Sequence, residues 1–272
     1  NTKVITLYIE GINRGSKFVE IAKAITPRKP IVALYVGGSE AGKQAGLSHT
    51  GSLSGPNEIY DGIFKQCGII RAKTLTELFD YALALGTLPR PGGNRIVIQT
   101  HSGGPGATAA DACSRVGLKL SRLSPETVKK LKPLIPKTAS TANPVDMTFS
   151  KNHADDYFNI PNILLSDSET DMLLAYFVSP GIFLERILGE MGVEENSINS
   201  EMDKLIGDFA QKFVSLTQAH PDKPIVGFTY RSLQEKMVRT LLDCGVPVYQ
   251  DPERAARSLA AVREYYERRG KM

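Results

Sequence analysis

One histidine of the sequence stands in a loop of small residues, where its imidazole would be accessible to a substrate. His49 lies in the segment 37–56, which is rich in Gly and Ser and separates an apolar run from a helical stretch. Histidine is neutral and nucleophilic near pH 7, so it can accept and pass on a phosphoryl group or a proton. His49 is therefore a candidate nucleophile, and a solvated loop histidine is the alternative.

The end of this loop is expected to begin a helix that can hold an anion. Pro56 stands near the first helical position, and the acidic Glu58 falls in the first turn. The N-terminus of a helix exposes unpaired N–H groups and a partial positive charge, which suits phosphate. The loop and the helix start together therefore favour phosphate chemistry around His49.

A second glycine-rich turn occurs at 100–111, between an apolar run and a helical stretch. Its residues Ser102, Gly103, Gly104 and Gly106 predict another anion-binding helix start. The pattern is not GxGxxG, so a dinucleotide site is not supported. Glycine also serves tight turns in general, and a purely structural turn stays open as the alternative.

Three further polar residues are candidates for a site. Glu10 follows a strand, where sites form in open α/β sheets, and its carboxylate could orient an imidazole or lie solvated in a loop. Asn143 precedes Pro144 and must be extended. Asp146 lines a site or caps the local turn, and both interpretations stay open.

The sequence disfavours several other kinds of site. The segment 37–44 resembles a nucleotide P-loop, but Gln44 replaces the Ser or Thr that binds magnesium, and no helix is expected from Lys43. No metal site is predicted, because the histidines lack helical spacing and no cysteine cluster exists. A GxSxG nucleophile elbow is absent as well.

Short apolar runs alternate with amphipathic helical stretches along the chain, which predicts parallel α/β sheets covered by helices on both faces. The expected strands are Val4–Ile9, Pro30–Val36, Arg95–Thr100, Asp171–Val178 and Pro224–Thr229. The expected helices are Ser16–Ile25, Asn57–Cys67, Thr76–Leu85, Ala107–Val116, Met202–Gln218, Gln234–Cys244 and Pro252–Arg269.

A stretch rich in glycine and proline, residues 86–94, predicts a linker between two domains. We therefore expect domains at 1–92 and 93–272. The first shows only three convincing strands, few for an independent sheet, so we expect it to be truncated at its start. The chain begins at Asn1 and enters a strand at once, as a fragment or a processed chain would.

Composition limits the classes of function. The 272 residues are 42% hydrophobic and 23% charged, which is typical of a folded globular protein. A net charge of +4 and the lack of basic runs disfavour nucleic-acid binding. No apolar run is long enough to span a membrane. Three dispersed cysteines are expected to be reduced, mostly buried thiols of a cytoplasmic protein.

Taken together, these motifs resemble nucleoside-diphosphate-forming acyl-CoA synthetases, the succinyl-CoA synthetase superfamily, and within it the ADP-forming acetyl-CoA synthetase branch. The resemblance covers most of the chain to about residue 147, and the segment 48–55 is its most specific part. The matching segments, in the order of the family, are 7–12, 29–32 leading to 38–40, 48–55, 102–106 and 143–146.

The resemblance implies two flavodoxin-like domains, the first of which carries a phosphohistidine loop. It assigns His49 as the phosphorylated residue and Glu10 as the carboxylate that orients it. The helix starting near Gly55 and the one after Gly104 would hold the phosphate. The phosphate-binding residues would be Ser48, Thr50, Gly51, Ser52, Ser102, Gly103, Gly104 and Gly106, with Asn143 and Asp146 as further candidates.

The reaction that the resemblance implies is acyl-CoA + phosphate + NDP ⇌ carboxylic acid + CoA + NTP. The complete enzyme needs CoA, ATP or ADP and Mg²⁺, bound mainly by a Rossmann-type CoA-binding domain and an ATP-grasp domain. We find neither in this sequence and expect them as partners in an oligomer. The alternatives are a non-catalytic regulatory or scaffold module, or the synthetase-like part of a protein lysine acetyltransferase.

Overall fold

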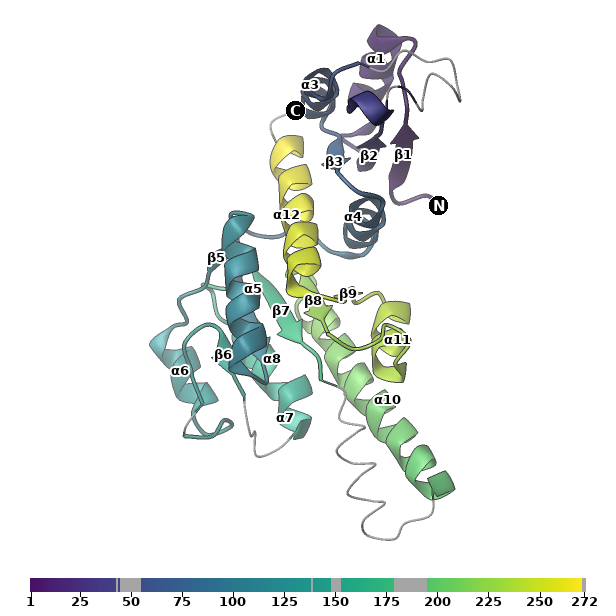
Figure 1. Cartoon of the computed structure of the whole chain (residues 1–272). Helices are drawn as coiled ribbons and strands as arrows, with labels where there is room; N and C mark the ends of the chain where they lie inside the picture. The colour runs from purple at the N-terminus through teal and green to yellow at the C-terminus, as the bar shows by residue number, and fades with distance from the viewer. Residues whose placement is uncertain (43, 45–54, 138, 148–152, 179–194, 271–272) are drawn as a thin grey trace. The chain divides into compact units, whose positions relative to one another are not determined.

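The chain folds into two compact units, each with its own parallel sheet (Figure 1). The computed structural model describes residues 1–42, 44, 55–137, 139–147, 153–178 and 195–270. The smaller unit comprises residues 1–87 and 260–272, and the larger unit comprises 88–259. Among these described residues no sheet crosses from one unit to the other, so the expected α/β class with separate parallel sheets is confirmed.

The smaller unit is a three-stranded parallel sheet in the order β1-β2-β3, between two layers of helices. Tyr35, Phe64 and Cys67 belong to the core that α1 and α3 form with one face, and α4 packs on the strands from the other side. The elements are β1 (Ile5–Ile9), α1 (Gly15–Ile25), β2 (Ile31–Tyr35), α3 (Asn57–Cys67), β3 (Ile70–Ala72) and α4 (Leu75–Thr87).

The larger unit has a six-stranded parallel sheet in the order β5-β4-β7-β8-β9, with β6 paired to the end of β4. Its strands are β4 (Arg95–Thr100), β5 (Lys119–Leu120), β6 (Val145–Asp146), β7 (Met172–Tyr176), β8 (Ile225–Phe228) and β9 (Val248–Tyr249). Its helices are α5 (Gly103–Arg115), α6 (Pro125–Leu131), α7 (His153–Tyr157), α8 (Asn159–Leu165), α10 (Glu195–Ala219), α11 (Lys236–Asp243) and the start of α12 (Pro252–Arg269).

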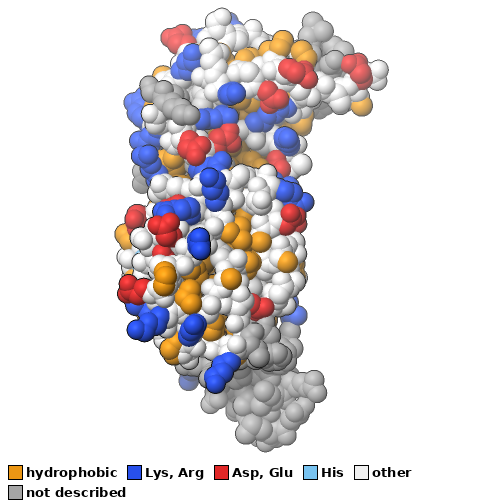
Figure 2. Space-filling model, turned by 90° about the vertical axis from the view of Figure 1, so that its left-hand side faces the viewer, with side chains coloured by type: hydrophobic (Ala, Val, Ile, Leu, Met, Phe, Trp, Pro, Cys, Tyr) orange, Lys and Arg blue, Asp and Glu red, His pale blue; other side chains and the backbone are white. Residues whose placement is uncertain are grey.

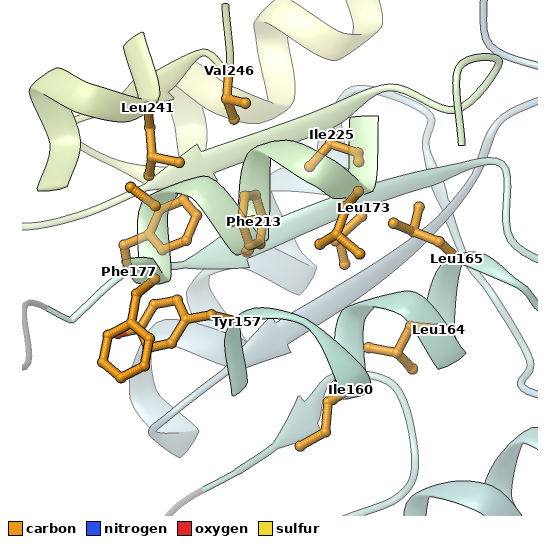
Figure 3. Packing of buried hydrophobic residues seen from close by; sticks show 14 of the residues in the cluster. Tyr157, Ile160, Leu164, Leu165, Leu173, Phe177, Phe213, Ile225, Leu241 and Val246 are labelled. Atoms are coloured by element: carbon orange, nitrogen blue, oxygen red, sulfur yellow. The ribbon is translucent and has the colours of Figure 1, made fainter. Parts of the chain in front are cut away.

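The main core of the larger unit lies between one face of its sheet and the helices α8, α10 and α11 (Figure 3). Leu173 and Ile225 point from neighbouring strands toward Phe213 of α10, and all three are buried. Phe177 meets the Phe213 ring edge-on with ring centroids 4.8 Å apart. Burial of a large apolar side chain stabilises a fold by roughly 1.5–3 kcal/mol. This core therefore stabilises the larger sheet, including β4, which leads into the glycine-rich start of α5.

The last helix, α12, begins in the larger unit and ends in the smaller one. Within the smaller unit, the Tyr265 hydroxyl donates to the Thr26 carbonyl over 2.9 Å, and Arg268 donates to the Ile69 carbonyl over 2.9 Å. These bonds tie the end of the chain to segments near its beginning. The expected domains 1–92 and 93–272 stay a prediction.

The long predicted elements agree with the structure, and the short ones were missed. The seven predicted helices correspond to α1, α3, α4, α5, α10, α11 and α12, and five predicted strands correspond to β1, β2, β4, β7 and β8. The linker prediction began too early, because α4 continues to Thr87 before the chain turns. Gly86 is therefore helical, which a glycine flanked by good helix formers tolerates at a cost of about 1 kcal/mol.

The surface and the cysteines add three observations. Acidic and basic side chains are intermixed on the face shown in Figure 2. Cys67 and Cys113 are buried, and burial raises the pKa of the Cys113 thiol to about 12, whereas Cys244 is exposed.

Among the described residues, no helix combines the length and the hydropathy that crossing a membrane requires.

Candidate functional site

The carboxyl edge of the smaller sheet brings Glu10 close to the start of the His49 segment. Strands β1 and β2 run parallel, and the Val36 N–H donates to the Ile9 carbonyl over 2.9 Å. Glu10 and Gly37 therefore leave the sheet at the same edge. Gly37 has a φ of 112°, a left-handed conformation that favours glycine and turns the chain out of the strand.

Glu10 borders an open cavity of about 460 Å³, lined by residues 7–12 and Phe18. The side chain is partly exposed. Its carboxylate makes no hydrogen bond or ion pair with another described residue, so it is available to a group outside that part of the chain. His49 itself, with Ser48, Thr50, Gly51 and Ser52, lies outside the described residues.

The end of the His49 segment is held at the N-terminus of α3. The Tyr35 hydroxyl donates to the Gly55 carbonyl over 2.6 Å. The Tyr35 ring stacks on Tyr60 with centroids 3.5 Å apart, and a Cβ on Gly55 would meet the Tyr60 ring at 3.3 Å. Pro56, extended with a ψ of 150°, then leads into α3. This aromatic pair therefore fixes the point where the helix begins.

The start of the same segment also lies against α3. A Cβ added to Gly38 would overlap the Asn57 side chain, whose atoms are the nearest to it. Asn57 is the first residue of α3 and accepts hydrogen bonds from Arg71 of β3. Gly38 and Gly55, near the two ends of the His49 segment, thus both contact the first turn of this helix.

In the larger unit, Ser102, Gly103 and Gly104 form the exposed start of α5. Ser102 adopts the extended N-cap conformation, but its side chain caps no N–H group of the helix. The first residues of a helix have no intrahelical acceptor, so the N–H groups of Gly103 and Gly104 point out of the helix end. Two exposed amides and the helix dipole suit an anion.

Gly106 has a packing role in the structure. Its N–H donates to the Ser102 carbonyl over 3.3 Å, so this amide is used inside the helix. A Cβ at Gly106 would lie 2.9 Å from Thr100 Cγ2 and 3.3 Å from Pro144 Cβ. The glycine therefore lets α5 approach β4 closely. Its predicted phosphate contact stays a prediction.

Asp146 lies at the carboxyl end of β4, whereas the Asn143 side chain bonds to residues further back along this strand. Asp146 pairs with Thr100, and its carboxylate oxygen would lie 3.8 Å from a Cβ on Gly103, beside the start of α5. Asn143 uses its amide within the sheet: it donates to the carbonyls of Ile96 and Ser121 and accepts from the Ile98 N–H. Asp146 is thus near the helix start, whereas Asn143 holds the backbone behind it.

Sequence reasoning missed two residues at these edges. Arg71 reaches the start of α3 from a three-residue strand, where no local pattern marks it as functional. His101 precedes α5, and its Nδ1 atom lies 3.9 Å from a carboxylate oxygen of the buried Asp156. The position of His101 next to a glycine-rich helix start was the signal that could have drawn attention to it.

Two family models match the chain in succession. The succinyl-CoA ligase like flavodoxin domain covers residues 1–85, and the ligase-CoA domain covers residues 96–210. The chain therefore contains these two succinyl-CoA ligase-type domains. The first region covers the smaller sheet, and the second covers the larger sheet without β8 and β9. The resemblance inferred from the motifs is confirmed.

Within this group of proteins, the chain is similar to ADP-forming acetyl-CoA synthetases. The chain is 37% identical over 262 residues to subunit alpha of acetate–CoA ligase (ADP-forming) II of Pyrococcus furiosus, covering 96% of this chain and 53% of that subunit. It is 32% identical to the 4-hydroxybutyrate–CoA ligase (ADP-forming) of Nitrosopumilus maritimus, covering 96% and 34%.

A solved structure agrees with these relatives. The dinucleotide-forming acetyl-coenzyme A synthetase 1 of Candidatus Korarchaeum cryptofilum, in complex with phosphate and ADP, superposes with a TM-score of 0.79 at 29% identity, covering 98% of this chain and 54% of that one. The chain is a homologue of the alpha subunits of ADP-forming acetate–CoA ligases, and it spans about half the length of such a subunit.

Proposed function

We propose that this chain supplies the phosphohistidine part of an ADP-forming acyl-CoA synthetase, with a small carboxylic acid such as acetate as substrate. The observation that carries the proposal is the meeting of three features at one sheet edge. Glu10, the flanks of the His49 segment at Gly38 and Gly55, and the N-terminus of α3 all lie at the carboxyl ends of β1 and β2.

In the proposed reaction, one imidazole nitrogen of His49 attacks the phosphorus of an acyl phosphate. The bond between phosphorus and the acyl oxygen breaks, and the carboxylate leaves with the electron pair. Glu10 accepts a hydrogen bond from the other ring nitrogen and balances the positive charge on the phosphorylated imidazole. Phosphoryl transfer depends mainly on positioning and on stabilisation of negative charge.

The exposed start of α5 is the proposed binding site for phosphate oxygens in the larger unit. The amides of Gly103 and Gly104 fit such a group, because each can donate a hydrogen bond to it. Asp146 stands beside these amides and would repel a fully charged phosphate, so we propose that it orients the anion by restricting where its oxygens lie.

The remaining components are proposed to come from other parts of the enzyme. A CoA-binding domain and an ATP-grasp domain, in the same polypeptide or in another subunit, would bind CoA and the nucleotide with Mg²⁺. Within the described residues, no group of three His, Cys, Asp or Glu side chains could hold a metal ion. We expect Mg²⁺ to arrive with the nucleotide and the enzyme to be cytoplasmic.

Phosphorylation of His49 is the direct test. The complete enzyme, incubated with Mg²⁺ and ATP radiolabelled at the γ-phosphate, should acquire an acid-labile, base-stable label. The variant His49→Ala should acquire none, because it lacks the nucleophilic ring. Full labelling of the folded variant would show that the phosphoryl group resides elsewhere, and it would overturn the assignment of this segment.

A further inference from the structure

Arg71 connects strand β3 to the first residue of helix α3. Its Nη1 atom donates to the Asn57 carbonyl over 3.2 Å, and its Nη2 atom donates to Asn57 Oδ1 over 2.6 Å. The guanidinium also pairs with the Asp61 carboxylate on the next turn of α3. The Arg71 side chain is only 19% exposed, and its guanidinium is held in place by its bonds to Asn57 and Asp61.

Asn57 in turn packs over the start of the His49 segment. The three atoms nearest to a Cβ on Gly38 all belong to the Asn57 side chain, and that Cβ would overlap them. An asparagine amide could normally rotate away from such a clash. Here the bond from Arg71 to Asn57 Oδ1 holds the amide, so Gly38 and the first turn of α3 constrain each other.

We propose that Arg71 is a positioning residue for phosphoryl transfer. It holds Asn57 against Gly38 and thereby fixes one end of the segment 38–55 relative to the N–H groups of α3. This inference rests on the proposed role of His49. Tyr35 holds the other end of the segment by its hydrogen bond to the Gly55 carbonyl. The two ends of the segment, Gly38 and Gly55, are therefore each held near the start of α3.

The shape of the guanidinium, more than its charge, carries this role. Asp61 neutralises part of the Arg71 charge, and its own side chain is 58% exposed, so this ion pair contributes little to stability. A lysine keeps the positive charge but replaces the rigid fork, which places one nitrogen on each of the two Asn57 oxygens, with a single rotatable ammonium on a flexible chain. Arg71→Lys therefore separates positioning from charge.

The experiment compares the rate of phosphohistidine formation in the complete enzyme under single-turnover conditions. We expect Arg71→Lys to slow labelling about 10- to 100-fold without changing the apparent affinity for ATP, since displacing a reacting group by about 1 Å can cost that much. Asp61→Asn should label at the wild-type rate. The matched control is Arg28→Lys, because exposed Arg28 follows α1 and donates to the Ala24 carbonyl, four residues before it and away from α3 in the sequence.

A double-mutant cycle tests the contact even if Arg71→Lys is poorly folded. Gly38→Ala should slow labelling in the wild-type background and add nothing in an Asn57→Ala background, because the three atoms nearest to the new methyl group all belong to the Asn57 side chain. Labelling of a folded Arg71→Lys at the wild-type rate, or additive effects in the cycle, would overturn the inference. Labelling of His49→Ala would instead refute the proposed function.

Discussion

At the residue scale, the proposed chemistry depends on one carboxylate, Glu10, which no other described residue binds. Glu10 follows β1 directly and borders the open cavity at the sheet edge. Most surface carboxylates are simply solvated, and the position of Glu10 after a strand does not distinguish it from them. Glu10 is distinguished by the parallel pairing of β1 and β2, which brings Gly37 and Gly38 to the same sheet edge.

Replacement of Glu10 by glutamine should slow phosphorylation of His49 on the order of 10²–10⁴-fold, the usual loss when an activating partner is removed. Glutamine has the same size but cannot balance a positive ring. The substitution should leave the unfolding temperature unchanged, because the carboxylate makes no bond to another described residue. Labelling rate and thermal unfolding measure the two effects, and an unaffected rate would exclude Glu10 as the orienting group.

At the scale of elements, an ion pair ties the beginnings of β4 and β7 together. Arg95 donates from Nη2 to Asp171 Oδ1 over 2.8 Å and from Nε to Asp171 Oδ2 over 3.0 Å, and its backbone N–H donates to the same carboxylate. Burial alone would raise the pKa of Asp171, but the bonds from Arg95 outweigh it and lower the pKa below its ordinary value.

Substitution of Asp171 by asparagine should lower the free energy of unfolding at pH 7 by about 1–3 kcal/mol, since Arg95 is partly exposed and water screens the pair. A carboxyl whose pKa is lowered in the folded state stabilises it above the unfolded pKa of about 3.9 and loses this effect as the pH falls. The difference between variant and wild type should therefore shrink toward about pH 3. Urea unfolding at both pH values measures it, and a constant difference would contradict this account.

At the scale of the whole molecule, the chain holds two sheet units and spans about half the length of the alpha subunits that it matches. Both units present a helix start after a parallel strand, α3 in the smaller and α5 in the larger. Both helix starts suit an anion, and we propose neither of them as a nucleotide site. The proposal therefore places nucleotide and CoA binding in other parts of the enzyme.

The isolated chain should accordingly acquire no label from radiolabelled ATP and Mg²⁺, because the nucleotide site is proposed to lie elsewhere. Addition of the separately purified remainder of the enzyme should restore labelling of His49. The control is the same mixture prepared with the His49→Ala chain. Any label that it acquires belongs to the added remainder of the enzyme and not to His49. Stoichiometric labelling of the isolated wild-type chain would place a nucleotide site within these 272 residues.

The sequence could not indicate several elements and contacts, for identifiable reasons. Strands β5, β6 and β9 contain two residues each, too few to show a period, and they exist through hydrogen bonds to β4 and β8. Arg71 gains its role from Asn57, fourteen positions away along the chain, and the partners Arg95 and Asp171 are 76 positions apart. Such pairs leave no local signal.

Apolar periodicity and motif spacing are local properties of the chain, so the long helices and strands, the parallel α/β class and the family resemblance could be predicted from the residues alone. Contacts between side chains that are distant in the sequence became visible in the fold. It placed the end of α12 in the smaller unit, used the Asn143 amide inside the sheet and held Asn57 over Gly38. These contacts depend on how distant backbone segments pack, and packing is a property of the folded chain as a whole.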